Sequence, residues 1–401
     1  MPSTDLDASV ATDGADGAAP STDLDAFAPD TAIDSAGGEV AAPPADFDAS
    51  VPDAPVDAAL TSLGVDAGVD RLGDPNDGGV ARRPRAILVS VDGLGGYYLR
   101  QQLDQGKLPN FAALKRAGAS TFNARADYDY TVTLPNHVTM LTGRPVAEDP
   151  ALPNTTYHGW AGNGDVPPAL TLHNAGNPNL SYIASVFDVV HDHGLATCLY
   201  SGKTKFSLFV NSYNGKNGAP DRVGEDNGRN KIDRVVIVDL ATELLMAALE
   251  GDLTSGGCDF AFLHIADTDW MGHNAGWGSE AWLSTLASVD QWLGRLAAFV
   301  DPSKTEDPFF LVITADHGGE QYGHSDPTLP SDFTIPFFIV GPGIPAGSDL
   351  YDLGGRFDPA DTRPRYSDPR QPVRNADAAN LIAHLLGLPP VPGAFMRDLL
   401  R

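Results

Sequence analysis

The chain has 401 residues, enough for one large domain or two ordinary ones, and a formal net charge of −27 at pH 7. Residues 1–80 contain seventeen Asp and Glu residues but one Arg, so more than half of the net charge lies in this first fifth of the chain. The rest is also acidic and has no long Lys/Arg cluster, which excludes bulk nucleic acid as a partner but not a small anionic substrate held by metal.

The hydropathy of the chain and its cysteine content further limit the possible classes of protein. No run of about twenty apolar residues occurs, so we expect no transmembrane segment, and no signal peptide is visible at Met1. The two cysteines, Cys198 and Cys258, both lie beside predicted strands. They allow one disulfide or two buried free thiols, and the sequence leaves this choice open.

Residues 1–81 consist mainly of Asp, Ala, Pro, Gly and Ser with almost no aromatic side chains. Such a segment buries too little apolar surface to offset its conformational entropy, so we predict a disordered acidic tether. Acidic tethers ahead of an enzyme are typical of exported bacterial proteins. We therefore expect a secreted, periplasmic or envelope-tethered protein, with a cytoplasmic location as the alternative.

The predicted elements of residues 82–401 alternate between strands and helices. Apolar runs bounded by turn residues predict strands at 86–91, 195–200, 260–265, 309–313 and 335–340. Apolar periodicity and Pro/Gly boundaries predict helices at 109–118, 133–143, 182–193, 237–250, 279–300 and 376–386, with a long irregular region at 145–179. This order predicts one α/β domain with a mostly parallel central sheet and helices on both faces.

The segment 130–138, Tyr-Thr-Val-Thr-Leu-Pro-Asn-His-Val, is typical of a chain that turns sharply into a helix. Thr133 can serve as the N-cap, and Pro135 suits the first turn because it has no N–H to leave unpaired. A hydroxyl at a helix N-terminus lies beside unpaired N–H groups and the positive end of the helix dipole, where a phosphate binds well. Thr133 is therefore either a simple cap or a catalytic group.

Candidate metal ligands follow three of the predicted strands. Asp92 follows the first, Asp267, Asp269 and His273 follow the strand 260–265, and Asp316, His317 and His324 follow the strand 309–313. Carboxyl ends of parallel strands meet at one edge of a sheet, so we expect these side chains to converge. Imidazole and carboxylate ligands suit Zn²⁺ best, with Mn²⁺ or Fe possible, and a set of this size indicates two ions about 4 Å apart.

In this order, Val91-Asp92-Gly93, Thr133-Leu134-Pro135-Asn136-His137, Asp269-x-x-Gly272-His273 and Asp316-His317-Gly318 resemble the alkaline phosphatase superfamily. The chain is most similar to its type I phosphodiesterase/nucleotide pyrophosphatase family, which also has a His-Gly-x-x-x-Asn phrase, matched here by 158–163. The resemblance runs from about Arg85 to the end. It implies an alkaline phosphatase-like fold and a phosphoric ester hydrolase.

The resemblance also implies the role of each matching residue. Asp92, Asp316 and His317 would hold one zinc ion together with the oxygen of Thr133, and Asp269, His273 and His324 would hold the other. Thr133 would be the nucleophile and form a phospho-threonine. Asn163 would donate to a phosphoryl oxygen, with help from the Leu134 N–H.

Several positions depart from the family pattern or remain ambiguous. Leu134 and Val138 replace aromatic residues that are usual in nucleotide pyrophosphatases. The third histidine lies much closer to the Asp-His pair than in those enzymes, and we prefer His324 to His384 because His384 falls in an apolar helix. The Asp-x-x-Gly-His spacing favours Asp269 over Asp267.

Other polar and aromatic residues near the motifs have less certain roles. We expect His137 and His264 to have supporting or structural roles. Lys203 contacts either the substrate anion or a surface partner, and no P-loop is present. We assign Trp270, Trp277 and Trp282 to the core.

The predicted function is therefore hydrolysis of phosphodiester or nucleotide pyrophosphate bonds in a small substrate. A phosphomonoesterase or phosphonate hydrolase on the same site is the alternative, and an inactive binding module of the same fold is the hypothesis from another class. The sequence does not determine the exact substrate, the metal or the oligomeric state.

Overall fold

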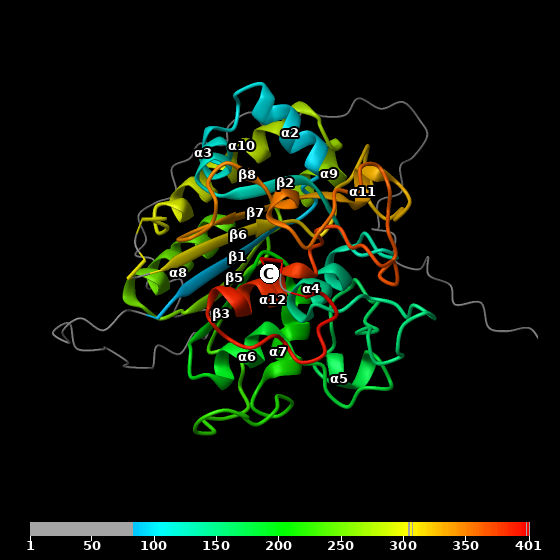
Figure 1. Cartoon of the computed structure of the whole chain (residues 1–401), viewed down its shortest axis with the longest axis vertical. Coiled ribbons are helices and arrows are strands. Elements are labelled where there is room, and N and C mark those ends of the chain that lie inside the picture. The colour runs from blue at the N-terminus through cyan, green and yellow to red at the C-terminus, as the bar shows by residue number, and fades with distance from the viewer. Residues whose placement is uncertain (1–82, 304, 307, 398, 401) are drawn as a thin grey trace, which may run out of the picture. The chain divides into compact units, whose positions relative to one another are not determined.

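The computed structural model describes residues 83–400 except 304, 307 and 398, and these residues contain a single eight-stranded sheet (Figure 1). The predicted tether at 1–81 lies outside the described residues. The strand order is β4-β3-β5-β1-β6-β7-β2-β8. The strands are β1 (Arg85–Val91), β2 (Ala119–Arg125), β3 (Thr197–Ser201), β4 (Arg234–Ile237), β5 (Phe260–Ile265), β6 (Phe309–Thr314), β7 (Thr334–Val340) and β8 (Ser348–Asp349).

The centre of the sheet is parallel, as predicted. β1 pairs in parallel with β5 on one side and with β6 on the other, and β3 continues the parallel set to β4. β7 is antiparallel to both β6 and β2. The five predicted strands are all present, and β1, β5 and β6 are buried along nearly their whole length because helices cover both faces.

Figure 1 shows α2, α3 and α10 on one face of the sheet and α4, α6, α7 and α12 on the other. The helices are α2 (Gly96–Asp104), α3 (Pro109–Ala117), α4 (Thr133–Thr142), α5 (Leu172–Ala175), α6 (Val186–Asp192), α7 (Ser207–Tyr213), α8 (Thr242–Ser255), α9 (Asp267–Ala275), α10 (Glu280–Ala297), α11 (Pro330–Phe333) and α12 (Asp377–Leu385), with 3₁₀ turns η1 (Thr204–Phe206) and η2 (Leu350–Leu353). None of the described helices is both long and apolar enough to cross a bilayer.

Two of the predicted helices begin later than expected. The prediction of a helix at 237–250 is wrong at its start, because residues 234–237 form β4 and α8 begins at Thr242 after Leu240, whose φ is 47°. The predicted helix at 182–193 begins at Val186. Its start is set by Ser185, whose backbone N–H donates to the Asp188 carboxylate at 2.8 Å in a capping box.

Two of the elements that were not predicted, β2 and α9, lack a clear apolar pattern. β2 carries polar residues along much of its length and is recognisable mainly through its pairing with β7. α9 consists largely of polar residues, several of which contribute to the site described below. Such segments acquire their structure from tertiary contacts more than from local periodicity.

The open question about the cysteines is resolved by the structure. Cys198 in β3 and Cys258 just before β5 form a disulfide with a Cα–Cα distance of 5.9 Å. The bond joins neighbouring strands at the end of the sheet opposite to the site, since both residues lie at the N-terminal ends of their strands.

Candidate metal centre

The carboxyl ends of β1, β5 and β6 meet at one edge of the sheet, as the pairing of β1 with both neighbours requires. Asp92 directly follows β1, and Asp316 and His317 follow β6. The Gly93 N–H donates to Asp316 Oδ1 at 3.1 Å, which ties the two strand ends together. Parallel strand order therefore brings together residues that are more than 200 positions apart.

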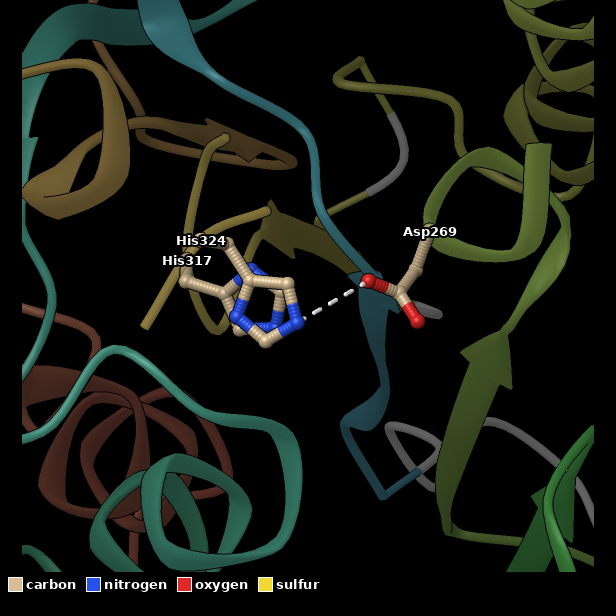
Figure 2. A group of neighbouring side chains, drawn as sticks. All are labelled: Asp269, His317 and His324. Carbon is tan, nitrogen blue, oxygen red and sulfur yellow. Dashed lines mark ion pairs between the residues drawn. The ribbon is translucent and has the colours of Figure 1, made fainter. Parts of the chain in front are cut away.

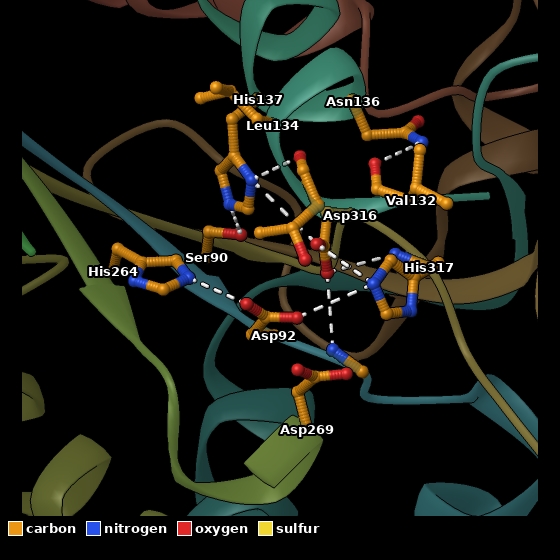
Figure 3. Close-up of polar contacts among 12 residues, drawn as sticks. Ser90, Asp92, Val132, Leu134, Asn136, His137, His264, Asp269, Asp316 and His317 are labelled. Carbon is orange, nitrogen blue, oxygen red and sulfur yellow. Dashed lines mark hydrogen bonds and ion pairs between the residues drawn. The ribbon is translucent and has the colours of Figure 1, made fainter. Parts of the chain in front are cut away.

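Asp92, Asp316 and His317 form the inner group of ligands, and all three are fully buried (Figure 3). His317 Nε2 lies 3.2 Å from Asp316 Oδ2 and 3.4 Å from Asp92 Oδ1. One oxygen from each carboxylate and one ring nitrogen thus face a common point. This is the set predicted to hold the first ion.

Asp269, His273 and His324 form the outer group. Asp269 and His273 are one turn apart on α9, and His273 Nε2 is 3.4 Å from Asp269 Oδ1. His324 Nε2 lies 3.5 Å from the same oxygen and 3.1 Å from His273 Nε2. Figure 2 shows the His324 ring stacked on His317, with 3.7 Å between ring centroids, so the two groups adjoin.

The glycines of the motifs allow this close approach. Gly93 has φ +70°, and a Cβ there would lie 3.1 Å from Asp269 Cα, so glycine lets Asp92 and α9 come together. A Cβ on Gly272 would lie 2.5 Å from the Trp277 ring. Trp277 in turn contacts the rings of His273 and His324, so the glycine between Asp269 and His273 makes room for the ring that supports both histidines.

The two acidic residues of α9 have different roles. Asp269 points into the site, whereas Asp267 Oδ2 accepts a hydrogen bond from Thr242 Oγ1 at 2.5 Å. The Asp267 carboxylate therefore joins the start of α9 to the start of α8. The geometry agrees with the spacing argument that favours Asp269.

Each candidate histidine ligand has one ring nitrogen bound to a backbone carbonyl. Nδ1 of His273, His317 and His324 contacts the carbonyl oxygens of Tyr322, Gly318 and Thr131 at 3.0, 2.8 and 2.6 Å. A carbonyl only accepts, so Nδ1 carries the proton and Nε2 presents its lone pair to the centre. This arrangement is typical of histidines that bind metal.

Several buried polar atoms of the site have no hydrogen-bond partner among the described residues: Asp92 Oδ1, Asp269 Oδ1, Asp316 Oδ2 and His317 Nε2. Buried polar atoms are normally paired, and a cluster of exceptions calls for an explanation. These four atoms converge from both ligand groups and are all electron-pair donors when the carboxylates are ionised and His317 is neutral. The residues therefore fit divalent metal ions, with nitrogen and oxygen donors that suit zinc.

The protonation states agree with this fit. Burial, followed by the neighbouring His324, lowers the pKa of His317 to about 3, and burial also lowers the pKa of His324. Burial and the charge of Asp92 raise the pKa of Asp316 well above its usual value. Closely spaced carboxylates without an ion resist simultaneous ionisation, so a cation would stabilise the charged set.

The turn that carries Thr133 is held over the inner group. Thr133 is buried and is the first residue of α4, and Val132 occupies the N-cap position, so of the two alternatives the simple cap is wrong. The buried Asn136 side chain donates to the carbonyls of Tyr130 and Val132 at 2.8 and 3.1 Å and accepts from the Asp127 N–H at 2.8 Å. Asn136 thus holds the turn, and the Thr133 hydroxyl is not used as a cap.

Two lysines also reach this region. Lys203 Nζ lies 2.6 Å from Asp92 Oδ2, 2.6 Å from Asp269 Oδ2 and 3.4 Å from Thr133 Oγ1. Burial lowers the pKa of Lys203, but Asp92 and Asp269 outweigh it and raise the pKa above its usual value, so the side chain is a fixed cation. The sequence left the partner of Lys203 open, and the structure places it between the two ligand groups.

Asn163 lies beside Thr133, as its motif suggested. Its Oδ1 accepts from the Leu134 N–H at 2.9 Å and from Lys205 Nζ at 3.3 Å. These contacts occupy the amide oxygen, and the Asn163 NH₂ group has no hydrogen-bond acceptor among the described residues. They also give the Leu134 N–H, which was expected to help bind phosphate, a partner within the protein.

Behind the inner group lies a layer of supporting side chains. His264 Nε2 is 2.9 Å from Asp92 Oδ2, and His137 Nε2 is 2.8 Å from the Ser90 hydroxyl (Figure 3). His137 Nδ1 also contacts the Thr133 carbonyl at 2.7 Å. Ser90 was missed by the motif search, because a serine within an apolar strand has no local pattern that reveals its partner.

The assignment of three tryptophans to the core is right for two of them. Trp277 and Trp282 are buried, and their indole N–H groups donate to the carbonyls of Gly93 and Thr268. Trp270 is 46% exposed on α9, so its assignment to the core is wrong. It lies on the same helix as Asp269 and His273.

One more group of potential ligands lies away from this edge. His191 and Asp192 of α6 face Asp221, and the buried Lys231 places its ammonium group against both carboxylates, 2.9 Å from Asp192 Oδ1. The lysine supplies the positive charge that two carboxylates require. This group is therefore an internal ion-pair network.

A protein-family model matches the part of the chain that contains these motifs. Residues 86–328, more than half of the chain, match the family model for type I phosphodiesterase/nucleotide pyrophosphatase. Among curated proteins, the GPI ethanolamine phosphate transferases 1 of Emericella nidulans and Aspergillus fumigatus are 27% and 28% identical over 130 residues, which is 32% of this chain. The chain covers 14% and 13% of the length of those relatives.

Similar solved structures share the fold. The murine ectonucleotide pyrophosphatase/phosphodiesterase 5, as an inactive variant in complex with AMP, aligns with a TM-score of 0.51 at 15% identity and covers 77% of this chain and 96% of its own. The alkaline phosphatase PafA, as a multiply substituted mutant, aligns with a TM-score of 0.53 at 13% identity and covers 80% and 99%. A Vibrio parahaemolyticus protein in the alkaline phosphatase superfamily has a TM-score of 0.50 at 16% identity, with 80% and 70% covered.

Proposed function

This chain belongs to the type I phosphodiesterase/nucleotide pyrophosphatase family, as its motifs indicated, and we propose that it hydrolyses phosphodiester or nucleotide pyrophosphate bonds with Thr133 as the nucleophile. One observation carries the proposal. A buried threonine hydroxyl lies at the edge of the sheet where two Asp/His groups converge, with every histidine Nε2 directed at the centre.

In this proposal Asp92, Asp316 and His317 would hold one zinc ion together with the Thr133 oxygen. Asp269, His273 and His324 would hold a second zinc ion. Mn²⁺ or Fe would fit the same donors less well. Bound ions of this kind lower the pKa of a hydroxyl and of water, and they neutralise the charge that develops on attacking and leaving oxygens.

The reaction then has two steps. Thr133 Oγ loses its proton to solvent and attacks phosphorus, the ester P–O bond breaks, and the leaving oxygen takes the electron pair and a proton from solvent, which gives a phospho-threonine. Water then attacks the same phosphorus and releases a proton, the P–Oγ bond breaks, and the Thr133 oxygen takes up a proton to regenerate the hydroxyl. Asn163 NH₂ donates to a non-bridging oxygen, and the Lys203 ammonium, 3.4 Å from Thr133 Oγ1, stabilises the negative charge of the phosphoryl group.

The lysines favour one alternative substrate class. A phosphate monoester or a phosphonate carries one negative charge more than a diester, and Lys203 and Lys205 bring two positive charges to Thr133 and Asn163. This arrangement supports a phosphomonoesterase or phosphonate hydrolase as the second candidate function. The AMP bound to the murine neighbour supports a nucleotide-like substrate for either candidate.

We further propose that residues 82–401 form one catalytic domain and that residues 1–81 tether it outside the cytoplasm. The single sheet, with one core that extends across it, supports the first part. The Cys198–Cys258 disulfide supports an oxidising compartment, because such bonds persist mainly in exported proteins.

Initial rates on bis-p-nitrophenyl phosphate and p-nitrophenyl phosphate test the proposal, after chelation and with Zn²⁺ restored. We expect a zinc-dependent preference for the diester that is lost in Thr133→Ala, while the variant still binds zinc. A preference for the monoester would move the assignment to the second candidate. Turnover that is unchanged in Thr133→Ala would refute the mechanism, and a zinc-loaded protein without activity on either ester would favour a binding module.

A further inference from the structure

The metal centre opens to solvent at one of its six Asp and His ligands. The side chain of His273 is 45% exposed, whereas those of Asp92, Asp316 and His317 are fully buried. A part of a substrate that extends away from the buried carboxylates on this side would therefore pass His273. The residues around His273 determine what that part of the substrate contacts.

Two exposed aromatic side chains border His273. Trp270, 46% exposed, lies three residues before it on α9, and residues with this spacing are neighbours on a helix surface. Tyr322, 64% exposed, belongs to the turn whose carbonyl accepts the His273 Nδ1–H at 3.0 Å. Both rings therefore flank the exposed ligand, one from the helix and one from the turn.

The Tyr322 turn is held in a strained conformation. Glu320 and Gly323 exchange two backbone hydrogen bonds of 3.0 Å, which leaves Gln321 and Tyr322 as a two-residue turn. Gln321 has φ +49°, in the left-handed region that glycine adopts more readily than glutamine. The Gln321 carbonyl accepts the Trp277 N–H at 2.8 Å, so the turn is docked firmly onto the chain that follows α9.

Gly276, at the end of α9, leaves space for the Tyr322 ring. A Cβ on Gly276 would lie 3.6 Å from the Tyr322 ring, so the phenol ring lies against the end of α9. A rigid turn that presents a large aromatic side chain to solvent beside a metal ligand gains little for folding. Exposed aromatic rings in fixed positions bind another flat apolar group well, because the stacked rings exclude water from the surfaces that they share.

We propose that Trp270 and Tyr322 form an aromatic platform for the part of the substrate that extends past His273, and that this part is an aromatic or otherwise flat apolar group. The inference rests on the proposed function, since it assigns the substrate class of the same site. It makes Trp270 and Tyr322 residues that determine specificity, with no part in bond breaking.

Equilibrium binding to zinc-loaded Thr133→Ala tests the platform without turnover. The probes are 1-naphthyl phosphate and methyl phosphate, measured by titration calorimetry. We expect 1-naphthyl phosphate to bind more tightly, and Trp270→Ser or Tyr322→Ser to weaken its binding about three- to ten-fold while methyl phosphate binds as before. Tyr97→Ser is the matched control, because Tyr97 is 66% exposed on α2 and should leave both affinities unchanged.

The outcomes separate the two proposals. The platform is refuted if naphthyl and methyl phosphate bind equally, if neither binds, or if both serine variants keep the wild-type ratio of the two affinities. The proposed function is tested by the turnover of the parent protein with Thr133 intact. A protein that prefers naphthyl phosphate but turns over no ester would retain the platform and refute the hydrolase.

Discussion

Substitution of Lys203 tests how the site manages its buried negative charge. The Lys203 ammonium group lies 2.6 Å from a carboxylate oxygen of both Asp92 and Asp269, and its side chain is 15% exposed. Lys203→Gln removes the charge and keeps most of the volume. Lys205→Gln is the matched control, since Lys205 contacts the amide oxygen of Asn163 at 3.3 Å and forms no ion pair with any residue that the structure describes.

The magnitude follows from the geometry. Breaking a buried ion pair by removing one partner costs about 3–5 kcal/mol, because the remaining charge is left without compensation. Lys203 is slightly exposed, and His264 and His317 also face Asp92, so we take the lower end, about 3 kcal/mol. For a domain of this size that corresponds to a melting temperature lower by roughly 6 °C.

The assay is thermal unfolding after chelation and again with Zn²⁺ restored. We expect chelated Lys203→Gln to melt well below chelated wild type, and the difference to shrink once zinc supplies positive charge to the same carboxylates. Lys205→Gln should change the melting temperature little in either condition. Equal melting temperatures of chelated wild type and chelated Lys203→Gln would refute the reasoning, because Lys203 would then contribute nothing to the neutralisation of Asp92 and Asp269.

Three further predictions concern the surroundings of the site. Asn136→Ala leaves the Tyr130 and Val132 carbonyls without their buried donor. The variant should have a lower kcat and a free energy of unfolding, measured by urea denaturation, that is lower by about 3 kcal/mol. Unchanged stability would show that the turn does not depend on the Asn136 side chain. Replacing Cys198 and Cys258 together by Ser opens a loop with a sequence separation of 60 and should cost about 2–4 kcal/mol, and a reducing agent should destabilise wild type but not the variant. Burial, with the charges of Glu320 and Asp326, raises the pKa of Asp332 from 3.8 to about 6. The native state therefore binds the carboxyl proton of Asp332 more tightly than the unfolded chain does, and stability falls as the pH rises between these two pKa values. Asp332→Asn should therefore gain in melting temperature relative to wild type as the pH rises from about 4 to about 6, and a constant difference would contradict the assignment.

The parts of the fold that were predictable carry their information locally. β1, β5 and β6 are continuous apolar runs bounded by turn residues, and their predicted limits agree with the structure to within a residue or so. β2 was missed because its stability comes from pairing with β7, a partner more than 200 residues away. The early start predicted for α8 has a related cause, since the apolar residues of the short strand β4 continue the apolar pattern of the helix that follows.

The same distinction explains the site. The ligands were recognisable because they follow the carboxyl ends of parallel strands, which lie at one edge of a sheet. Asp92, Asp316 and His317 meet at that edge. The role of Lys203 was not recognisable, because the carboxylates that explain it are 66 or more residues away. Exposure is also a property of the assembled fold, so the sequence assigned Trp270 to the core together with Trp277 and Trp282.

This difference has a consequence for how specificity arises in the chain. Apart from His273, the groups that would perform the chemistry are buried, and short motifs in the sequence identify them. Trp270 and Tyr322 instead lie on a helix surface and in a tight turn, where the local sequence can change without disturbing the sheet. Substitutions at those two positions should therefore alter which ester is bound and leave the folded state almost unaffected. Substitutions at Asn136 or Gly272 should do the reverse, because the nucleophile turn and the ring of Trp277 depend on them.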